Sequence, residues 1–243
     1  LALEDLGRAA DLFRPVHERT AGVDGWVSLE VSPLLAHDTA STLAAAKELF
    51  ARAKRQNLFI KIPGTKEGLP AIEEAIFAGV PVNVTLLFSR EHYLAAAEAF
   101  LRGVERRIEA GLDPNVGSVA SLFVSRWDAA VVGKVPAELA NRLGIAIAMR
   151  AYAAYRGLLS TPRWQRTYNS GARPQRFGHV AGGDHSKNGT LDNVAGVAKG
   201  AGQTYLAVRP QKLLNLDGNY FFEGLGGSHE LKFGFGYRDL LTD

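Results

Sequence analysis

Four short apolar runs, separated by longer alanine-rich stretches, constrain the fold of this chain more than any other feature of its sequence. The runs cover Val27–Val31, Leu58–Ile62, Val82–Phe88 and Val119–Val124. Short continuous apolar runs are typical of strands that are buried on both faces. Strands that alternate with helices form parallel β/α units, so the sequence predicts an α/β fold.

The stretches between these runs carry apolar residues at helical spacing. One stripe consists of Leu43, Ala46, Leu49, Phe50 and Ala53, and a second of Tyr93, Ala97, Phe100, Leu101, Val104 and Ile108. Ser89 is a suitable N-cap for the second helix, and Gly111 a suitable stop. Two further helices are expected over Leu3–Phe13 and Leu139–Leu159.

The character of the chain changes near residue 176. The last 67 residues hold 13 of the 26 glycines, helical periodicity disappears, and Gly182–Gly189 is expected to be a loop. Apolar and other residues then alternate from Leu231 to Tyr237, and a turn at Gly226–Gly227 would pair this run with Tyr220–Phe222 as a hairpin. We therefore expect two domains, residues 1–176 and 177–243.

Charge and composition exclude several classes of function. The formal net charge is +3 without a concentrated basic run, so nucleic-acid binding is not expected. Cysteine is absent, which excludes disulfides, thiolate catalysis and cysteine-bound metals, and fits a reducing compartment. No apolar run approaches the roughly 20 residues of a membrane helix. The chain has no signal peptide and does not begin with Met, so we expect a fragment.

Polar residues within buried strands need an explanation, and here they share one face of each strand. Side chains alternate between the faces of a strand. The apolar faces are expected to hold Val27, Leu29 and Val31, then Leu58, Ile60 and Ile62, then Val82, Val84 and Leu86, then Leu122 and Val124. The opposite faces then bring Glu30, Lys61, Asn83, Thr85 and Ser121 together in one interior.

Lys61 is the residue of this set with the most distinctive chemistry. Phe59 and Leu87 are expected beside it, and removal from water favours the neutral, nucleophilic amine. Glu30 is placed to move protons, which together with an amine suits carbonyl chemistry through an imine. The alternative is that Glu30 and Lys61 form a structural ion pair. Thr85 and Ser121 are uninformative when each is taken alone.

Four motifs around these residues resemble those of transaldolases, in the same order. They are Ser28–Pro33, Ile60–Thr65, Asn83–Ser89 and Ser121–Arg126, and the resemblance covers residues 1–176. It implies a (β/α)₈ TIM barrel of the class I aldolase type in the cytoplasm. It also implies transfer of a dihydroxyacetone unit between sugar phosphates of the pentose phosphate pathway, with no metal or organic cofactor.

The same resemblance implies a role for each candidate residue. Lys61 matches the Schiff-base lysine, and Glu30 and Thr85 match the residues that hold and activate the catalytic water. Asn83 matches an active-site amide, Ser121 and Arg126 match contacts to substrate and phosphate, and Phe123 matches an aromatic side chain beside the site. The implied substrates are fructose 6-phosphate, sedoheptulose 7-phosphate, erythrose 4-phosphate and glyceraldehyde 3-phosphate.

The chain also departs from the pattern of the family. The family's first strand carries an aspartate acid/base and its second strand an asparagine, and no residue here matches either one. Gly171–Arg176 matches the approach to the seventh strand, and no transaldolase-like sequence follows. We therefore expect a partial barrel with weak or no transfer activity, and self-association through its open sheet edges.

The tail resembles a different family. Leu216–Phe222 and Glu230–Arg238 are similar to β-barrel segments of TonB-dependent outer-membrane receptors. A cytoplasmic enzyme joined to an outer-membrane strand pair makes little physical sense, so we hypothesise an artificial or accidental junction near residue 177. An ordinary hairpin or a disordered tail is the alternative. For the whole chain, two further hypotheses are an imine-forming aldolase of the deoxyribose-phosphate type and a non-catalytic chimeric fragment.

Overall fold

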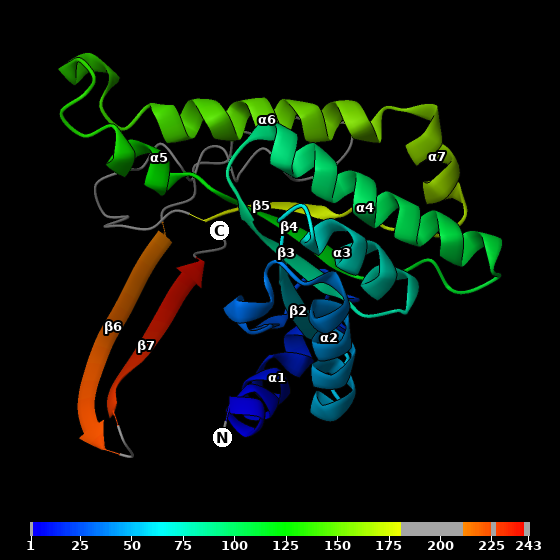
Figure 1. Ribbon diagram of the computed structural model, residues 1–243, viewed down its shortest axis with the longest axis horizontal. Coiled ribbons are helices and arrows are strands. Elements are labelled where there is room, and N and C mark those ends of the chain that lie inside the picture. Colours follow the sequence, from blue (N-terminus) through cyan, green and yellow to red (C-terminus); the bar gives the residue numbers. More distant parts are fainter. Residues whose placement is uncertain (1, 181–210, 225–226, 241–243) are drawn as a thin grey trace. The chain divides into compact units, whose positions relative to one another are not determined.

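A parallel five-stranded sheet with helices outside it forms the main body of the protein. The computed structural model describes residues 2–180, 211–224 and 227–240. The strands are β1 (Val27–Glu30), β2 (Leu58–Pro63), β3 (Val82–Leu87), β4 (Ser118–Phe123) and β5 (Arg176–Val180), all parallel and in the order β1-β2-β3-β4-β5. This order confirms the predicted α/β class and the partial TIM barrel (Figure 1).

One helix precedes the first strand, and at least one helix lies between each strand and the next, as β/α units require. The helices are α1 (Ala2–Arg19), α2 (Thr39–Ala53), α3 (Gly68–Phe77), α4 (Arg90–Glu109), α5 (Ser125–Ala130), α6 (Leu143–Leu159) and α7 (Pro162–Asn169), with short 3₁₀ helices η1 (Pro33–Leu35) and η2 (Ala137–Leu139). Ser89 caps α4 by accepting a hydrogen bond from His92 N, as predicted. None of the helices between residues 2 and 180 combines the length and apolar character that crossing a bilayer requires.

The hydrophobic core lies between the strands and these helices. Leu58, Ile60 and Ile62 on β2 are fully buried, and so are alanines of the covering helices such as Ala46 and Ala75. On the edge strand β1, Val27 and Leu29 are only partly buried and pack against the same core. The predicted apolar faces of these two strands are therefore confirmed.

The third strand departs from the predicted alternation at its end. Val84 pairs with Ala120 and Leu87 pairs with Leu122, so β3 contains one residue more than β4 between these positions, which is a β-bulge. Leu86, within the bulge, has a left-handed backbone conformation with a φ of 59° and is partly exposed, whereas Leu87 is fully buried. The assignment of Leu86 to the apolar face is therefore wrong, and so is the expectation that Leu87 lies beside Lys61.

Close packing explains why Leu87 takes the buried position. A Cβ atom placed on Gly64 would lie 2.5 Å from Cδ2 of Leu87 and 3.3 Å from Cγ1 of Val84. Leu87 thus fills the space that a side chain at position 64 would occupy. Burying the larger leucine over a glycine stabilises the bulge, because buried leucine side chains contribute about 1.5–3 kcal/mol each.

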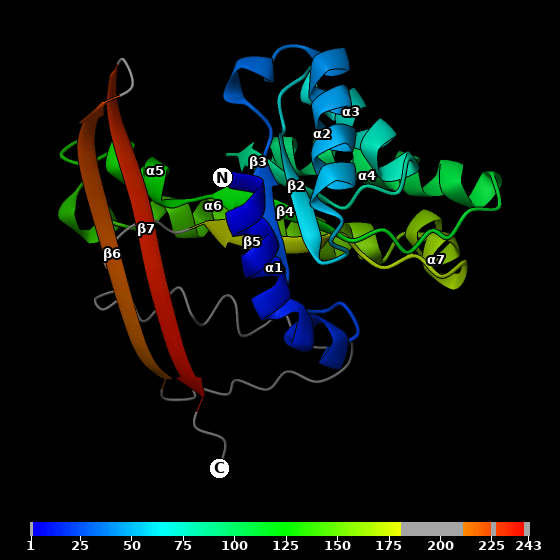
Figure 2. The same cartoon turned by 90° about the horizontal axis from the view of Figure 1, so that it is seen from below.

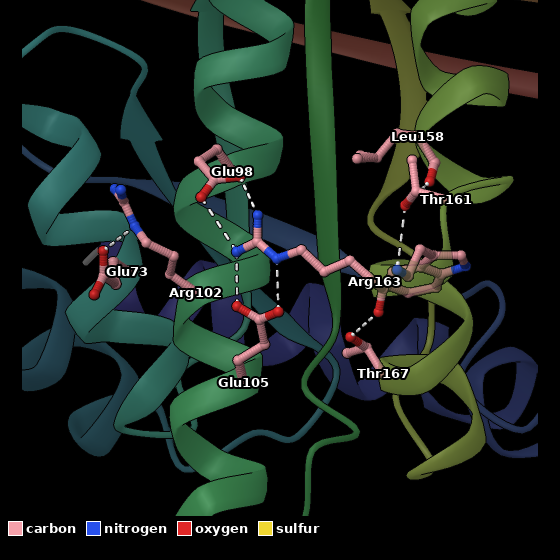
Figure 3. Close-up of polar contacts among 9 residues, drawn as sticks. Glu73, Glu98, Arg102, Glu105, Leu158, Thr161, Arg163 and Thr167 are labelled. Atoms are coloured by element: carbon pink, nitrogen blue, oxygen red, sulfur yellow. Dashed lines mark hydrogen bonds and ion pairs between the residues drawn. The ribbon is translucent and has the colours of Figure 1, made fainter.

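Arg163 fastens α7 to α4 through two carboxylates (Figure 3). Its guanidinium donates hydrogen bonds of 2.7 and 3.2 Å to Glu98 and two of 2.7 Å to Glu105. These hydrogen bonds raise the pKa of Arg163, so the group stays charged. Because α7 leads into β5, the clamp helps to hold the fifth strand in the sheet.

The chain divides into two compact units, Leu1–Gly183 and Asp184–Asp243. In the second unit, β6 (Gln211–Gly224) and β7 (Gly227–Leu240) pair in antiparallel fashion from Gln211↔Leu240 to Gly224↔Gly227, which confirms the predicted hairpin. The boundary expected after residue 176 lies inside β5, which pairs with β4. The loop expected over Gly182–Gly189 lies outside the described residues.

Candidate active site

The candidate residues of the first two strands meet on the face of the sheet opposite the helices. Glu30 is the register partner of Lys61, and Lys61 is the register partner of Asn83, so the three stand level on adjacent strands. Lys61 Nζ donates a hydrogen bond of 2.9 Å to Glu30 Oε2. The side chains are 28% and 42% exposed, so the pair is open to a molecule arriving from solvent.

A second set of polar groups spans three strands beside this pair. Ser121 Oγ on β4 donates to Asn83 Oδ1 at 2.8 Å, and Asn83 Nδ2 donates to Ser28 Oγ on β1 at 3.3 Å. Asn83 is thereby fixed from both sides, which determines the orientation of its amide. Both hydrogen bonds run across the same face that carries Lys61, so this face is an organised polar surface.

Thr85 lies two residues after Asn83 on β3, and therefore on the same face of the strand. Its register partner is Pro63, and only 1% of the residue is exposed. Its carbonyl accepts a hydrogen bond of 2.8 Å from Gly64 N, which ties the end of β3 to the loop after β2. The bulge begins immediately after Thr85, so this residue keeps the parity of Asn83 while Leu87 does not.

Phe123 and Arg126 lie at the carboxyl end of β4 and in the first turn of α5. The guanidinium carbon of Arg126 lies 4.8 Å from the centroid of the Phe123 ring, within the range of a cation–π contact. The Phe123 ring lies 5.5 Å from that of Phe88. An exposed arginine held over an aromatic ring can present its planar fork to a phosphate.

Ser28 and Trp127 are two residues of this region that were not among the candidate site residues predicted from the sequence. Ser28 shares strand parity with Glu30, and that signal was available in the sequence. Trp127 Nε1 donates a hydrogen bond of 2.7 Å to the carbonyl of Phe88, which joins α5 to the loop after β3. No sequence pattern announces that contact.

The chemistry open to this face is that of an amine and a carboxylate. Among the strand residues that point to it between β1 and β5, Glu30 is the single carboxylate. Among the described residues, no group of three or more His, Cys, Asp or Glu side chains is placed to hold a metal ion. An amine beside a carboxylate, with hydroxyl and amide groups around them, suits the formation of an imine with a polyhydroxylated carbonyl compound.

Comparison with known proteins gives a consistent match to one family. The family model described as transaldolase/fructose-6-phosphate aldolase matches residues 1–182. A transaldolase of Parafrankia sp. is 48% identical over 180 residues, covering 71% of this chain and 49% of that protein. A transaldolase of Thermobifida fusca is 50% identical over 180 residues, with the same shares. One of Acidothermus cellulolyticus is 48% identical over 183 residues, covering 72% and 49%.

This match confirms the resemblance drawn from the four motifs, all of which lie within residues 1–182. The chain spans about half the length of the curated relatives it matches. The family match ends before the hairpin, so the resemblance of the tail to outer-membrane receptors stays a prediction.

Proposed function

Because the chain belongs to the transaldolase/fructose-6-phosphate aldolase family, we propose that its polar sheet face carries transaldolase chemistry. In this proposal Lys61 forms an imine with a ketose phosphate and passes a three-carbon dihydroxyacetone unit to an aldose phosphate. The observation that carries the proposal is the contact of 2.9 Å between Lys61 Nζ and Glu30, level with Asn83 on a face open to solvent.

Imine formation begins when the neutral amine of Lys61 attacks the ketose carbonyl carbon. The amine must first give up a proton, and Glu30 is within hydrogen-bond distance to accept it. The carbinolamine then loses its hydroxyl group as water. The reverse step needs a water molecule, which Glu30 and Thr85 would hold and activate.

Breaking the carbon–carbon bond requires a second proton transfer. A base removes the proton from the C4 hydroxyl, the C3–C4 bond breaks, and the electron pair moves onto the protonated imine to give an enamine. The imine nitrogen is the electron sink, so the proposal needs no metal or organic cofactor. With Glu30 as the single carboxylate on the described face, we expect imine formation to be faster than complete transfer.

The remaining polar groups suit the rest of a sugar phosphate. Asn83 and Ser121 are joined at 2.8 Å and offer hydrogen-bonding groups beside Lys61 for substrate hydroxyls. Arg126 would bind the phosphate, with Phe123 holding its guanidinium plane. Fructose 6-phosphate and sedoheptulose 7-phosphate are the proposed donors, and erythrose 4-phosphate and glyceraldehyde 3-phosphate the acceptors.

A cytoplasmic location and the division at residue 176 remain parts of the proposal.

Trapping the imine tests this function directly. The protein is incubated with fructose 6-phosphate, reduced with borohydride and digested, and the peptides are examined by mass spectrometry. A reduced adduct on Lys61, absent from the Lys61→Arg variant, is expected. If folded protein gives no adduct, or gives it on another lysine, the proposal fails.

A turnover assay separates transfer from simple cleavage. Formation of sedoheptulose 7-phosphate from fructose 6-phosphate and erythrose 4-phosphate would show transfer. Free dihydroxyacetone released without an acceptor would show aldol cleavage instead. Activity with 2-deoxyribose 5-phosphate in place of these sugars would favour a deoxyribose-phosphate type of aldolase.

A further inference from the structure

A cavity of about 580 Å³ lies at the opposite end of the strands from Lys61. Residues at or just before the starts of all five strands line it: Trp26, Gln56, Pro81, Gly117 and Arg176. Its volume falls within the range of about 300–1,000 Å³ that is usual for small-molecule sites. The residues of the proposed transaldolase site do not line it, so this cavity needs an explanation of its own.

The charged side chains around the cavity are predominantly cationic. Arg107, Arg173 and Arg176 line it, against one acidic residue, Asp113. Asp113 Oδ1 is already engaged, because it accepts a hydrogen bond of 2.9 Å from Asn115 N. His17 also lines the cavity, and burial lowers the pKa of its ring, which favours the neutral form over a further positive charge.

The guanidinium groups of Arg107 and Arg173 bond to backbone carbonyls. Arg107 donates to the carbonyls of Asp113 and Phe77, at 2.6 and 2.7 Å, and Arg173 Nη1 donates to the carbonyl of Ala21 at 2.7 Å. These contacts hold the two side chains in place and leave their positive charges unneutralised. Among the residues that the structure describes, none provides either arginine with a carboxylate within 4.0 Å.

Several half-buried arginines on the outer helices, among the described residues, are paired with carboxylates. Arg102 and Arg106 both pair with Glu73, and Arg163 pairs with Glu98 and Glu105. The cavity therefore differs from the other places where guanidinium groups are held in partly buried positions.

Of the three arginines, Arg176 gives the strongest argument for a bound anion. Burial lowers its pKa, against the attraction of Asp24, and its guanidinium carbon lies 6.0 Å from the centroid of the Phe59 ring. Within the described part of the chain no carboxylate forms an ion pair with it. A partly buried cation without an ion-pair partner costs free energy, which a bound anion would offset.

An aromatic wall lies beside these cations. Trp26 stacks on Phe59 with ring centroids 4.1 Å apart, and the His17 ring meets it edge-on at 4.7 Å. The indole N–H donates to the carbonyl of Gly22 at 2.9 Å, and a Cβ on Gly117 would lie 2.8 Å from the indole ring. The indole is thus fixed from several sides, so its side chain loses little further conformational entropy when a ligand packs on it.

We propose that this cavity is a second binding site, for a small anion with a flat aromatic body. The anionic group would lie between Arg173 and Arg176, and the ring would pack against Trp26. An aromatic ring has the shape and polarisability to pack on the indole, and a phosphate or carboxylate suits the planar fork of arginine. The site is independent of Lys61 and of the transaldolase proposal.

Calorimetric titration with three probes tests the composition of the ligand. Phenyl phosphate carries both parts, inorganic phosphate only the anion, and phenol only the ring. One saturable site for phenyl phosphate is expected, with a Kd at least tenfold lower than that of either fragment. Equal affinity for phosphate and phenyl phosphate would overturn the aromatic part of the proposal, and no saturable binding would overturn all of it.

Charge-matched variants test the location. Arg173→Gln and Arg176→Gln should each raise the Kd of phenyl phosphate at least fivefold, whereas Arg150→Gln, which removes an exposed arginine that does not line the cavity, should leave it unchanged. A thermal melt of each variant shows whether it is folded. If Arg176→Gln does not fold, Arg173→Gln provides the test, because Arg173 is exposed. Loss of binding in Arg126→Gln instead would place the ligand at the other end of the strands and overturn the proposal.

A spectroscopic measurement locates the aromatic ring. With ¹⁵N-labelled indoles, the Trp26 N–H resonance, assigned by Trp26→Phe, should shift on titration with phenyl phosphate, whereas those of Trp127 and Trp164 should not. An unmoved Trp26 signal at saturation would contradict the proposal. Borohydride trapping at Lys61 should be the same in Arg173→Gln as in the unaltered protein, so the two proposals can fail separately.

Discussion

Asn83 on β3 donates a hydrogen bond of 3.3 Å to Ser28 on β1, although β2 lies between the two strands. In a flat sheet, strands two positions apart are separated by about 9.5 Å, which these short side chains would not bridge. The contact therefore requires the sheet to curve toward this face, as a barrel wall does. The curvature is what brings polar groups from β1, β3 and β4 around Lys61, and Figure 2 shows the strongly twisted strands from a second direction.

Removing the Asn83 amide should affect both stability and imine formation. Asn83→Ala deletes the hydrogen bonds to Ser28 and Ser121, and the expected loss in unfolding free energy is about 1–2 kcal/mol. The yield of reduced adduct at Lys61 should fall at least fivefold, because the polar surface beside the amine is lost. Ser28→Ala removes only the longer hydrogen bond and serves as the milder control in urea unfolding and in trapping.

Replacing Glu30 should slow imine formation with little effect on stability. The Glu30–Lys61 pair is partly exposed, and pairs of this kind contribute about 0–1 kcal/mol. In Glu30→Gln the amine loses its proton acceptor, so the rate of adduct formation should fall at least tenfold. Glu48→Gln is the matched control, since it breaks a pair of the same 2.9 Å length on α2. Equal rates in the two variants would show that the carboxylate is only structural.

Loss of the Arg163 clamp should loosen the packing of α7. Arg163→Gln removes hydrogen bonds to two carboxylates and leaves Glu98 and Glu105 close together without a counter-charge. We expect the unfolding free energy to fall by about 1–3 kcal/mol, as for other charged hydrogen-bond networks that are partly exposed. Arg52→Gln, which breaks a single exposed pair on α2, should change it by less than about 0.5 kcal/mol. Guanidinium unfolding followed by circular dichroism measures both variants.

Acid should abolish the stabilisation of the fold by the contact between α1 and the end of α2. Arg55 donates two hydrogen bonds of 2.8 Å to Asp11 and holds the pKa of that carboxyl below its ordinary value of 3.8. A carboxyl whose pKa is lowered by folding stabilises the protein above its unfolded pKa and stops doing so as the pH falls through its folded pKa. The difference in Tm between the unaltered protein and Asp11→Asn should therefore be present at pH 7 and shrink below pH 4. A difference that persists at pH 2.5 would rule out the carboxylate as its source.

The positions of the strands, the face on which their side chains lie and the residues of the candidate site could largely be predicted from the sequence. Lys61, Glu30, Asn83 and Ser121 share a face because alternation along a strand is a local property of extended backbone. The α2 and α4 helices were predicted for a similar reason, since their periodicity and the Ser89 cap lie within the segments themselves. The hairpin after residue 210 was signalled by its alternation and by glycines at its turn.

Other features arise only when distant segments meet. The bulge that buries Leu87 and turns Leu86 outward depends on the empty space over Gly64, and parity counted along one strand contains no information about it. The clamp joining Arg163 to Glu98 and Glu105 connects residues 58 and 65 positions apart.

The sequence by itself determined the β/α units, the family and the polar face that carries Lys61, because each follows from local periodicity or from a contiguous motif. The tertiary structure alone decided how strongly that face curves and which leucine of β3 is buried. It also decided that three arginines, which have no carboxylate partner among the described residues, line one cavity with Trp26 at the other end of the strands. Curvature, bulges and the neutralisation of charge depend on which side chains from remote segments compete for the same space, and that competition is settled only when the chain is folded.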